Sequence, residues 1–287
     1  METTRRNMLA LAGLTPFLSL ATFIQRAEAE GYRFGNSEEE ANKIAHDAHV
    51  DLMRYPGLEM HGDEDIAMIC YDGMTMLDLI GPQYFFASMM GARVHLVSAD
   101  SELKPIMGDT GFAIVPTISM ADCPEKLDIL FVPGGTMGTV RTMKNRPFID
   151  FIAERGASAK HVTSVCTGSM ILGQAGLLKG KRATSHWSAR HLLPEFEAIA
   201  VDARVVRDGN VTTGAGVSAG LDFAIALLAQ MRGDAYAQAV QLQAEYAPEP
   251  LFTAGTLDTI DPKLGEPMHE MFAAALYAIK EASQSRL

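Results

Sequence analysis

The residue of this sequence best placed for nucleophilic chemistry is Cys166. It follows the apolar, β-branched run 161–165 and precedes the small residues 167–169, after which residues 170–178 repeat apolar side chains at helical spacing. This pattern predicts a buried strand, a sharp turn and a helix, with the thiol at the corner. The free N–H groups and positive dipole end of that helix favour thiolate over thiol. The alternative is a buried, inert cysteine, but the small-residue turn favours the reactive interpretation.

An acidic partner for this thiol is predicted in the segment TMLDLIGP, where Asp78 lies between Leu77 and Leu79. One interpretation is a helix cap, a position for which Asp is strongly preferred. The other is a carboxyl group held against apolar walls, where burial raises its pKa and keeps it protonated near a thiolate.

Donors and polar groups for a substrate are expected at Thr167, Gly134, Gly135 and His186. The backbone N–H of Thr167 and one from Gly134 or Gly135 would stabilise a developing anion; alternatively, the two glycines only form a tight turn. The Thr167 hydroxyl either binds the substrate or merely fits the turn. His186, beside the only tryptophan, is either a base for Cys166 or a hydrogen-bonded structural histidine.

Composition excludes several functions. The 287 residues carry a formal net charge of −11, which argues against a nucleic-acid partner. The three cysteines form no CxxC pair and there is no HExxH motif, so we expect no bound metal. Neither GxGxxG nor a P-loop is present, and covalent catalysis by cysteine needs no cofactor. The expected partner is therefore a small-molecule substrate.

The elements that must position these residues alternate between strand and helix patterns from Asp65 onward. Such alternation predicts an α/β fold with a mostly parallel sheet and helices on both faces, in which ligands bind at the carboxyl ends of the strands. Expected strands are 66–71, 94–99, 112–118, 128–132, 161–165 and 182–185, with a hairpin over 204–213. Expected helices are 38–49, 79–90, 148–155, 170–178, 189–196, 217–231, 235–246 and 267–282.

The amino terminus has the features of an export signal. Arg5-Arg6 precedes an apolar run over residues 9–24, and residues 27–29 supply an A-x-A cleavage site. The run is too short and too interrupted for a membrane span, so we expect no stable membrane insertion of the mature protein. The alternative to a signal peptide is an amphipathic N-terminal helix. A twin-arginine signal predicts a periplasmic or secreted protein. If the segment is not a signal, we expect a cytoplasmic protein.

The predicted organisation of the whole chain is a signal peptide (1–29), an arm or linker (30–63), an α/β domain (64–252) and a C-terminal helical extension (253–287).

Four ordered motifs carry a family resemblance: YDGMTMLDLIGP, DILFVPGG, VTSVCTGSMILGQAGLLKGKRATSHW and VVRDGNVTTGAGVSAGLDFAIAL. Together they resemble the PfpI/ThiJ branch of the class I glutamine amidotransferase-like superfamily, and in particular its isonitrile hydratases. The resemblance runs from about Asp65 to Phe252. It implies a flavodoxin-like three-layer sandwich, a homodimer, and catalytic roles for Cys166, Asp78 and Thr167.

The sequence departs from other branches of that superfamily. Asp78 stands where the proteases and deglycases typically have Glu, and Thr167 stands where the proteases have His. The resemblance therefore implies a carbon–nitrogen lyase that adds water to an isonitrile and releases an N-substituted formamide. Two alternatives remain open: a glyoxalase-like lyase acting on 2-oxoaldehydes, and a non-catalytic redox sensor or binding protein in which Cys166 is oxidised reversibly.

Overall fold

The computed structural model describes residues 31, 33–99 and 102–284, and the chain divides into two compact units, Met1–Pro56 and Gly57–Leu287. The first unit contains helix α2 (Glu38–Met53), whose N-cap Ser37 accepts a hydrogen bond from the Glu40 N–H at 3.2 Å. A helix was expected over 38–49, so α2 extends one turn further. The predicted signal peptide over 1–29 lies outside the described residues.

The second unit is built on a sheet whose strands run in the order β10-β11-β7-β6-β1-β2-β5. Every neighbouring pair is parallel except β10 and β11, which form the expected antiparallel hairpin. From β2 to β11 this is the flavodoxin-like strand order, with its switch point between β1 and β6. The strands are β1 (Asp65–Cys70), β2 (Arg93–Ser98), β5 (Ile118–Ser119), β6 (Ile129–Val132), β7 (His161–Val165), β10 (Val205–Asp208) and β11 (Val211–Gly214).

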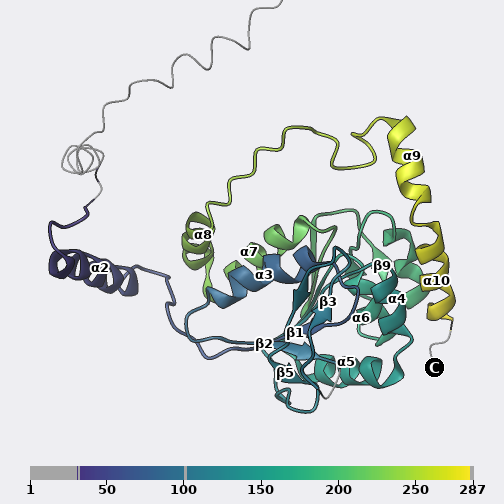
Figure 1. Cartoon of the computed structure of the whole chain (residues 1–287), viewed down its shortest axis with the longest axis horizontal. Helices are drawn as coiled ribbons and strands as arrows, with labels where there is room; N and C mark the ends of the chain where they lie inside the picture. Colours follow the sequence, from purple (N-terminus) through teal and green to yellow (C-terminus); the bar gives the residue numbers. More distant parts are fainter. Residues whose placement is uncertain (1–30, 32, 100–101, 285–287) are drawn as a thin grey trace, which may run out of the picture. The chain divides into compact units, whose positions relative to one another are not determined.

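Helices cover both faces of this sheet, which confirms the predicted fold class. Helices α3 and α7 lie together on one face, with α8 packed against α7, and α4, α5 and α6 lie on the other (Figure 1). Their bounds are α3 (Met76–Ala87), α4 (Met137–Met143), α5 (Arg146–Ser158), α6 (Gly168–Gln174), α7 (Ala219–Arg232) and α8 (Asp234–Gln243).

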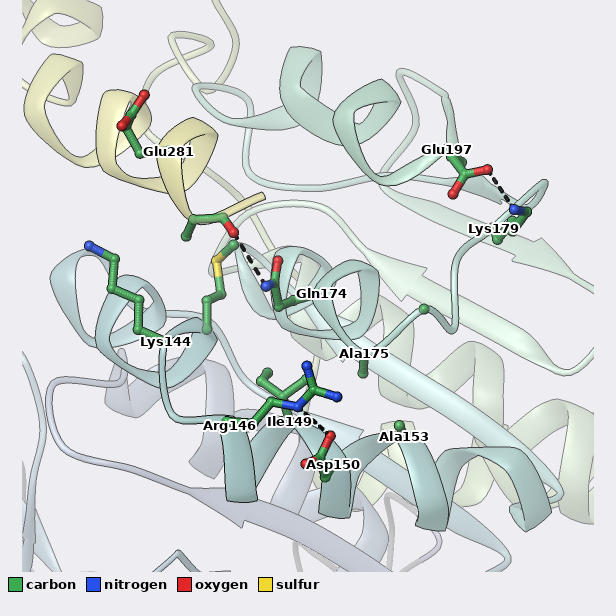
Figure 2. A pocket seen from close by; sticks show the side chains of 13 residues that line it. Lys144, Arg146, Ile149, Asp150, Ala153, Gln174, Ala175, Lys179, Glu197 and Glu281 are labelled. Atoms are coloured by element: carbon green, nitrogen blue, oxygen red, sulfur yellow. Dashed lines mark hydrogen bonds and ion pairs between the residues drawn. The ribbon is translucent and has the colours of Figure 1, made fainter. Parts of the chain in front are cut away.

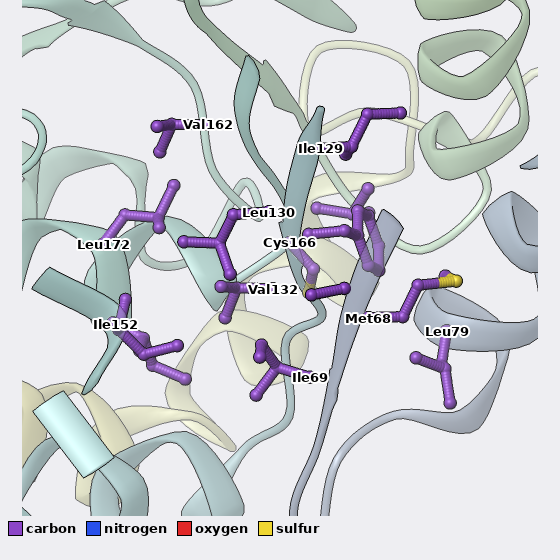
Figure 3. Close-up of a cluster of buried hydrophobic side chains, with 14 of the residues drawn as sticks. Met68, Ile69, Leu79, Ile129, Leu130, Val132, Ile152, Val162, Cys166 and Leu172 are labelled. Carbon is purple, nitrogen blue, oxygen red and sulfur yellow. The ribbon is translucent and has the colours of Figure 1, made fainter. Parts of the chain in front are cut away.

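The core lies between the sheet and its two helical layers (Figure 3). Strands β1, β6 and β7 are almost entirely buried, including Met68, Leu130 and Val162. A parallel sheet covered on both faces requires such continuous apolar strands. Each fully buried aliphatic side chain stabilises the fold by about 1.5–3 kcal/mol. Cys166, directly after β7, belongs to the same buried core.

Several elements differ from the sequence expectation. The region 112–118 forms not one strand but β4 (Ala113–Ile114), paired with β3 (Ile106–Met107), and then the start of β5. Two short strands, β8 (Arg182–Ala183) and β9 (Ile199–Ala200), pair separately from the main sheet and flank the 3₁₀ helix η1 (Arg190–Phe196). Helix α4 was not expected, because its sequence MGTVRTM has little helical periodicity.

The C-terminal segment forms two helices, α9 (Pro262–Glu270) and α10 (Ala273–Ser283), where one helix over 267–282 was expected. Asp261 caps α9 by accepting a hydrogen bond from the Lys263 N–H at 2.9 Å. The helices meet at Phe272, whose ring packs on Trp187. This segment belongs to the same compact unit as the sheet.

The segment immediately before the sheet is attached to the second unit by a buried ion pair. Arg232 of α7 is 3% exposed and donates to the Glu64 carboxylate at 2.6 Å and to the carbonyl of Glu59 at 3.1 Å. The second compact unit begins at Gly57, so it includes the last part of the segment that the sequence assigned to an arm or linker over 30–63. Across the part of the chain that is described, none of the helices combines the length and apolar character that a membrane crossing needs.

Candidate active site

Cys166 occupies a strained corner between strand β7 and helix α6. Its φ is +57°, a left-handed conformation that is uncommon for a residue with a side chain. Hydrogen bonds hold this conformation: the Cys166 N–H donates to the Ala215 carbonyl at 2.6 Å, and the Cys166 carbonyl accepts from the hydroxyls of Ser169 (3.1 Å) and Ser185 (3.0 Å). The expected strand, sharp turn and helix are thus present, and the surrounding structure fixes the thiol position.

Gly134, at the end of β6, lies between the thiol and the acid. A Cβ atom on Gly134 would be 2.8 Å from the Cys166 Cβ and 2.8 Å from Asp78 Oδ2. The Cys166 Cβ and the carboxylate oxygen are therefore at most twice that distance apart. The same added Cβ atom on Gly134 would lie 2.6 Å from the Thr167 backbone nitrogen. The structure thus brings Cys166, Asp78 and Thr167 together around a position that no larger residue can occupy without displacing them.

Asp78 is a buried carboxyl group inside helix α3, not its cap. The N-cap is Thr75, so the helix begins three residues earlier than expected and the capping interpretation of Asp78 is wrong. Its Oδ2 accepts the Gly134 N–H at 3.0 Å, and its Oδ1 is buried without a partner among the described residues. Burial raises the pKa of Asp78 to about 7, against the opposing effects of the Gly134 N–H and the Cys166 thiol.

The predicted preference of Cys166 for the thiolate form is wrong. Burial, and next the negative charge of Asp78, raise the pKa of the Cys166 thiol well above its usual value. The Thr167 N–H opposes this shift, but α6 spans only seven residues and its first N–H groups do not outweigh burial. The resting thiol therefore keeps its proton, and the adjacent Asp78 carboxylate is the group that can accept it.

The Thr167 hydroxyl belongs to a buried hydrogen-bond chain. It donates to the Gly135 carbonyl at 2.8 Å, accepts the Gly135 N–H at 3.0 Å, and lies 2.9 Å from the Thr139 hydroxyl. Tyr71 continues the chain, 3.3 Å from Thr139, and donates to the Pro133 carbonyl at 2.8 Å. Sequence reasoning missed Thr139 and Tyr71, because only the fold places them beside Thr167.

The predicted role of the two glycines as donors to the substrate requires correction. The Gly134 N–H donates to Asp78 and the Gly135 N–H donates to Thr167, so both are engaged within the protein. Of the expected backbone donors, the Thr167 N–H is the one directed at the Cys166 sulfur. The glycines instead orient the acid and the threonine hydroxyl.

A pocket of about 200 Å³ opens onto Cys166 and Thr167. His186 lines it, but its Nδ1 lies 2.7 Å from the Ser188 hydroxyl and its ring packs on Trp187 and Phe272. Burial lowers the pKa of His186 to about 4, so the ring is neutral. These contacts fit the structural interpretation of His186. The lining residues are Thr75, Asp109, Gly135, Thr136, Cys166, Thr167, His186, Ser188, Ala189, Val217, Phe272, Ala275, Leu276 and Ile279.

A larger hollow of about 730 Å³ lies elsewhere, between α5, α6 and the end of α10 (Figure 2). Its walls include the ion pairs Arg146–Asp150 and Lys179–Glu197, at 2.8 Å each. No residue singled out from the sequence lines it. Because none of its described lining residues is a cysteine, serine or threonine, we assign the chemistry to the smaller pocket, which holds Cys166. Within the described ranges, no three His, Cys, Asp or Glu side chains are grouped to hold a metal ion.

The fold and this site define a flavodoxin-like α/β protein with a cysteine elbow facing a buried carboxyl group. The chain belongs to the DJ-1/PfpI family, whose model matches residues 64–230. It is 48% identical to an isonitrile hydratase of Pseudomonas putida over 194 residues, which are 68% of this chain and 83% of that protein. It is also similar to a deglycase of Thermococcus kodakarensis, at 29% identity over 50% of this chain and 86% of that protein. Among solved structures, a ThiJ/PfpI family protein of Pseudomonas syringae has a TM-score of 0.78 and 46% identity, covering 80% of this chain and 94% of that one.

Proposed function

We propose that this protein is an isonitrile hydratase-like carbon–nitrogen lyase that converts an isonitrile and water into an N-substituted formamide. The observation that carries the proposal is the pairing of Cys166 with Asp78 across Gly134, at the base of a small pocket. The likeness to the hydratase of Pseudomonas putida supports the choice of substrate. The terminal carbon of an isonitrile has little steric cover, which suits a nucleophile such as Cys166, a residue that is only 6% exposed.

The first half of the reaction forms a covalent thioimidate. Asp78 accepts the thiol proton as the Cys166 sulfur bonds to the terminal isonitrile carbon, and then delivers that proton to the same carbon. The product of this half is R–N=CH–S–Cys166, with Asp78 again ionised. A carboxyl group whose pKa is about 7 can accept and return a proton at neutral pH.

The second half hydrolyses this intermediate. Asp78 removes a proton from a water molecule as the water oxygen bonds to the thioimidate carbon. The carbon–sulfur bond then breaks, the sulfur regains a proton, and the imidic acid tautomerises to the formamide. One water is consumed and no electrons are transferred. Thr167, held by Gly135 and Thr139, positions the water or the substrate nitrogen.

A substrate panel tests the proposal. The mature protein and Cys166→Ala would be incubated with simple alkyl isonitriles and with methylglyoxal, and formamide and lactate would be measured. Formamide production by the wild-type protein alone supports the hydratase. Lactate without formamide favours a 2-oxoaldehyde lyase. Neither product, together with reversible sulfenic acid at Cys166 after mild peroxide, favours a redox sensor. Formamide production by Cys166→Ala at the wild-type rate contradicts the mechanism.

We also propose that the protein is exported and forms a homodimer. The twin-arginine pattern at Arg5-Arg6 supports export, which cell fractionation of a tagged chain would test. An exposed apolar stripe on α3 supports dimerisation: Leu77, Ile80 and Tyr84 are 46%, 42% and 41% exposed and recur at helical spacing. Light scattering of the wild type and of Ile80→Glu would test it. A monomeric wild type contradicts it.

A further inference from the structure

The pocket above Cys166 has two chemically different walls. The wall formed by the sheet edge and its loops is mostly polar, with Ala189 and Val217 as apolar members, and holds the reacting groups Cys166 and Thr167. The rest of the lining comes from the C-terminal segment, which contributes Phe272, Ala275, Leu276 and Ile279. All four of these side chains are apolar. The sequence predicted this segment only as a helical extension beyond the α/β domain, whereas in the structure it lines the pocket.

Helix α10 is fixed against the domain along one face. Ala275, Ile279 and Ala282 are buried at helical spacing, whereas Tyr277 on another face is 67% exposed. At the other end of the helix, the Gln174 amide donates to the Ala282 carbonyl at 3.3 Å (Figure 2). The helix also packs against α4 and η1. These contacts make the apolar side chains a built wall of the pocket.

Aromatic contacts anchor the start of this wall beside the site. The Phe272 ring lies 5.4 Å from the His186 ring and 5.8 Å from the Trp187 ring, and Trp187 lies 5.9 Å from His269 of α9. Ring separations of this size are typical of favourable aromatic packing. Trp187 is the only tryptophan of the chain, so its fluorescence reports whether the C-terminal segment is packed in place.

The pocket offers no cation to a charged substrate. Among the described residues that line it there is no Lys or Arg. The one carboxylate on its rim, Asp109, already accepts a hydrogen bond from the Thr75 hydroxyl at 2.6 Å. Its volume of about 200 Å³ lies below the roughly 300–1,000 Å³ typical of pockets for drug-sized ligands. Its walls therefore suit a small, uncharged molecule whose apolar part faces α10.

We propose that α10 is the specificity wall of the Cys166 pocket and selects uncharged substrates with a compact apolar substituent. Ala275 and Leu276 set the size limit: Ala275 leaves room for the substituent, and Leu276 bounds it. That these substrates are isonitriles rests on the proposed function, whereas the size limit does not.

The test uses alkylation of Cys166, which requires no turnover. Rates with N-methylmaleimide and N-cyclohexylmaleimide would be measured on the full chain by mass spectrometry of the Cys166 peptide, so that Cys70 and Cys123 do not contribute. The variants are Ala275→Leu and Leu276→Ala, with Tyr277→Ala as the exposed control on the same helix.

Ala275→Leu should lower the rate ratio of the cyclohexyl to the methyl reagent by about 10-fold or more, the usual effect of a few carbon atoms in an apolar pocket. Leu276→Ala should raise that ratio, and Tyr277→Ala should leave it within about twofold. Trp187 fluorescence would confirm that α10 remains packed. A ratio unchanged in both Ala275→Leu and Leu276→Ala, with wild-type fluorescence, overturns the specificity wall. Altered ratios without any isonitrile turnover would support the wall and refute only the proposed function.

Discussion

Replacing Asp78 by Asn should stabilise the folded protein at neutral pH and above while impairing its activity. The fold raises the pKa of Asp78 from its ordinary 3.8 to about 7. Below pH 4 this carboxyl is protonated in both the folded and the unfolded chain. As the pH rises from 4 to 7 the unfolded chain loses the proton and the folded protein keeps it, so ionisation increasingly favours unfolding. Above pH 7 this effect is complete and costs the fold about 4 kcal/mol.

The Asn variant removes that cost but adds a smaller one. An Asn oxygen can still accept the Gly134 N–H, whereas the Asn NH₂ group would take the place of Oδ1, which has no partner among the described residues. A buried, unpaired donor costs about 1–3 kcal/mol. We therefore expect Asp78→Asn to be more stable than the wild type by about 1–3 kcal/mol at pH 8.

Urea unfolding followed by Trp187 fluorescence at pH 4, 6 and 8 would measure this difference. The difference between the free energies of unfolding of the variant and the wild type isolates Asp78, because other titrating groups contribute to both. It should grow with pH and level off above 7. A difference that stays constant from pH 4 to 8 would refute the raised pKa of Asp78.

The same variant should lose activity by about 10²–10⁴-fold, because an amide cannot transfer the proton. In the wild type, kcat/KM should rise with pH through about 7. The active form of the Cys166–Asp78 pair carries one proton in total, and that apparent pKa belongs to the pair. A flat pH profile between 5 and 8 would contradict the role of Asp78.

Three further substitutions test the site. Cys166→Ala should abolish formamide production and leave urea unfolding cooperative. Gly134→Ala should lower kcat/KM by about 10²-fold, because the added methyl group displaces Cys166 and the acid; Gly255→Ala, which has open space around it, is the control and should match the wild type. Thr139→Val should lower kcat and leave the rate of Cys166 alkylation unchanged, because it frees the Thr167 hydroxyl from its 2.9 Å partner; a wild-type kcat would show that this contact does not position Thr167.

Local sequence patterns predicted the sheet well, because its central strands are continuous apolar runs. The observed β1, β2, β6 and β7 begin and end within about one residue of the expected ranges. The corner at Cys166 was also predictable, since small residues directly follow a buried strand. Helix α3 was misplaced at its start, because its N-cap residue Thr75 makes no side-chain capping hydrogen bond and the apolar residues that follow gave no earlier boundary.

Interactions between distant segments could not be predicted from these patterns. The pKa of the Cys166 thiol depends on burial and on Asp78, which is 88 positions away in the sequence. The hydrogen-bond chain through Tyr71 and Thr139 and the wall contributed by α10 depend in the same way on tertiary packing. Local periodicity can show that a helix is amphipathic, but it does not specify which surface its apolar face covers.

The strand order explains why glycine is required at position 134. Cys166 follows β7 and Asp78 follows β1, and β6 lies between these two strands. Neighbouring strands are about 4.8 Å apart, so the ends of β1 and β7 are separated by roughly 10 Å. The thiol and the carboxyl group can meet only above the end of β6. Gly134 stands there without a side chain, and its N–H orients the acid. The contact between nucleophile and acid therefore depends on a residue that has no reactive group of its own.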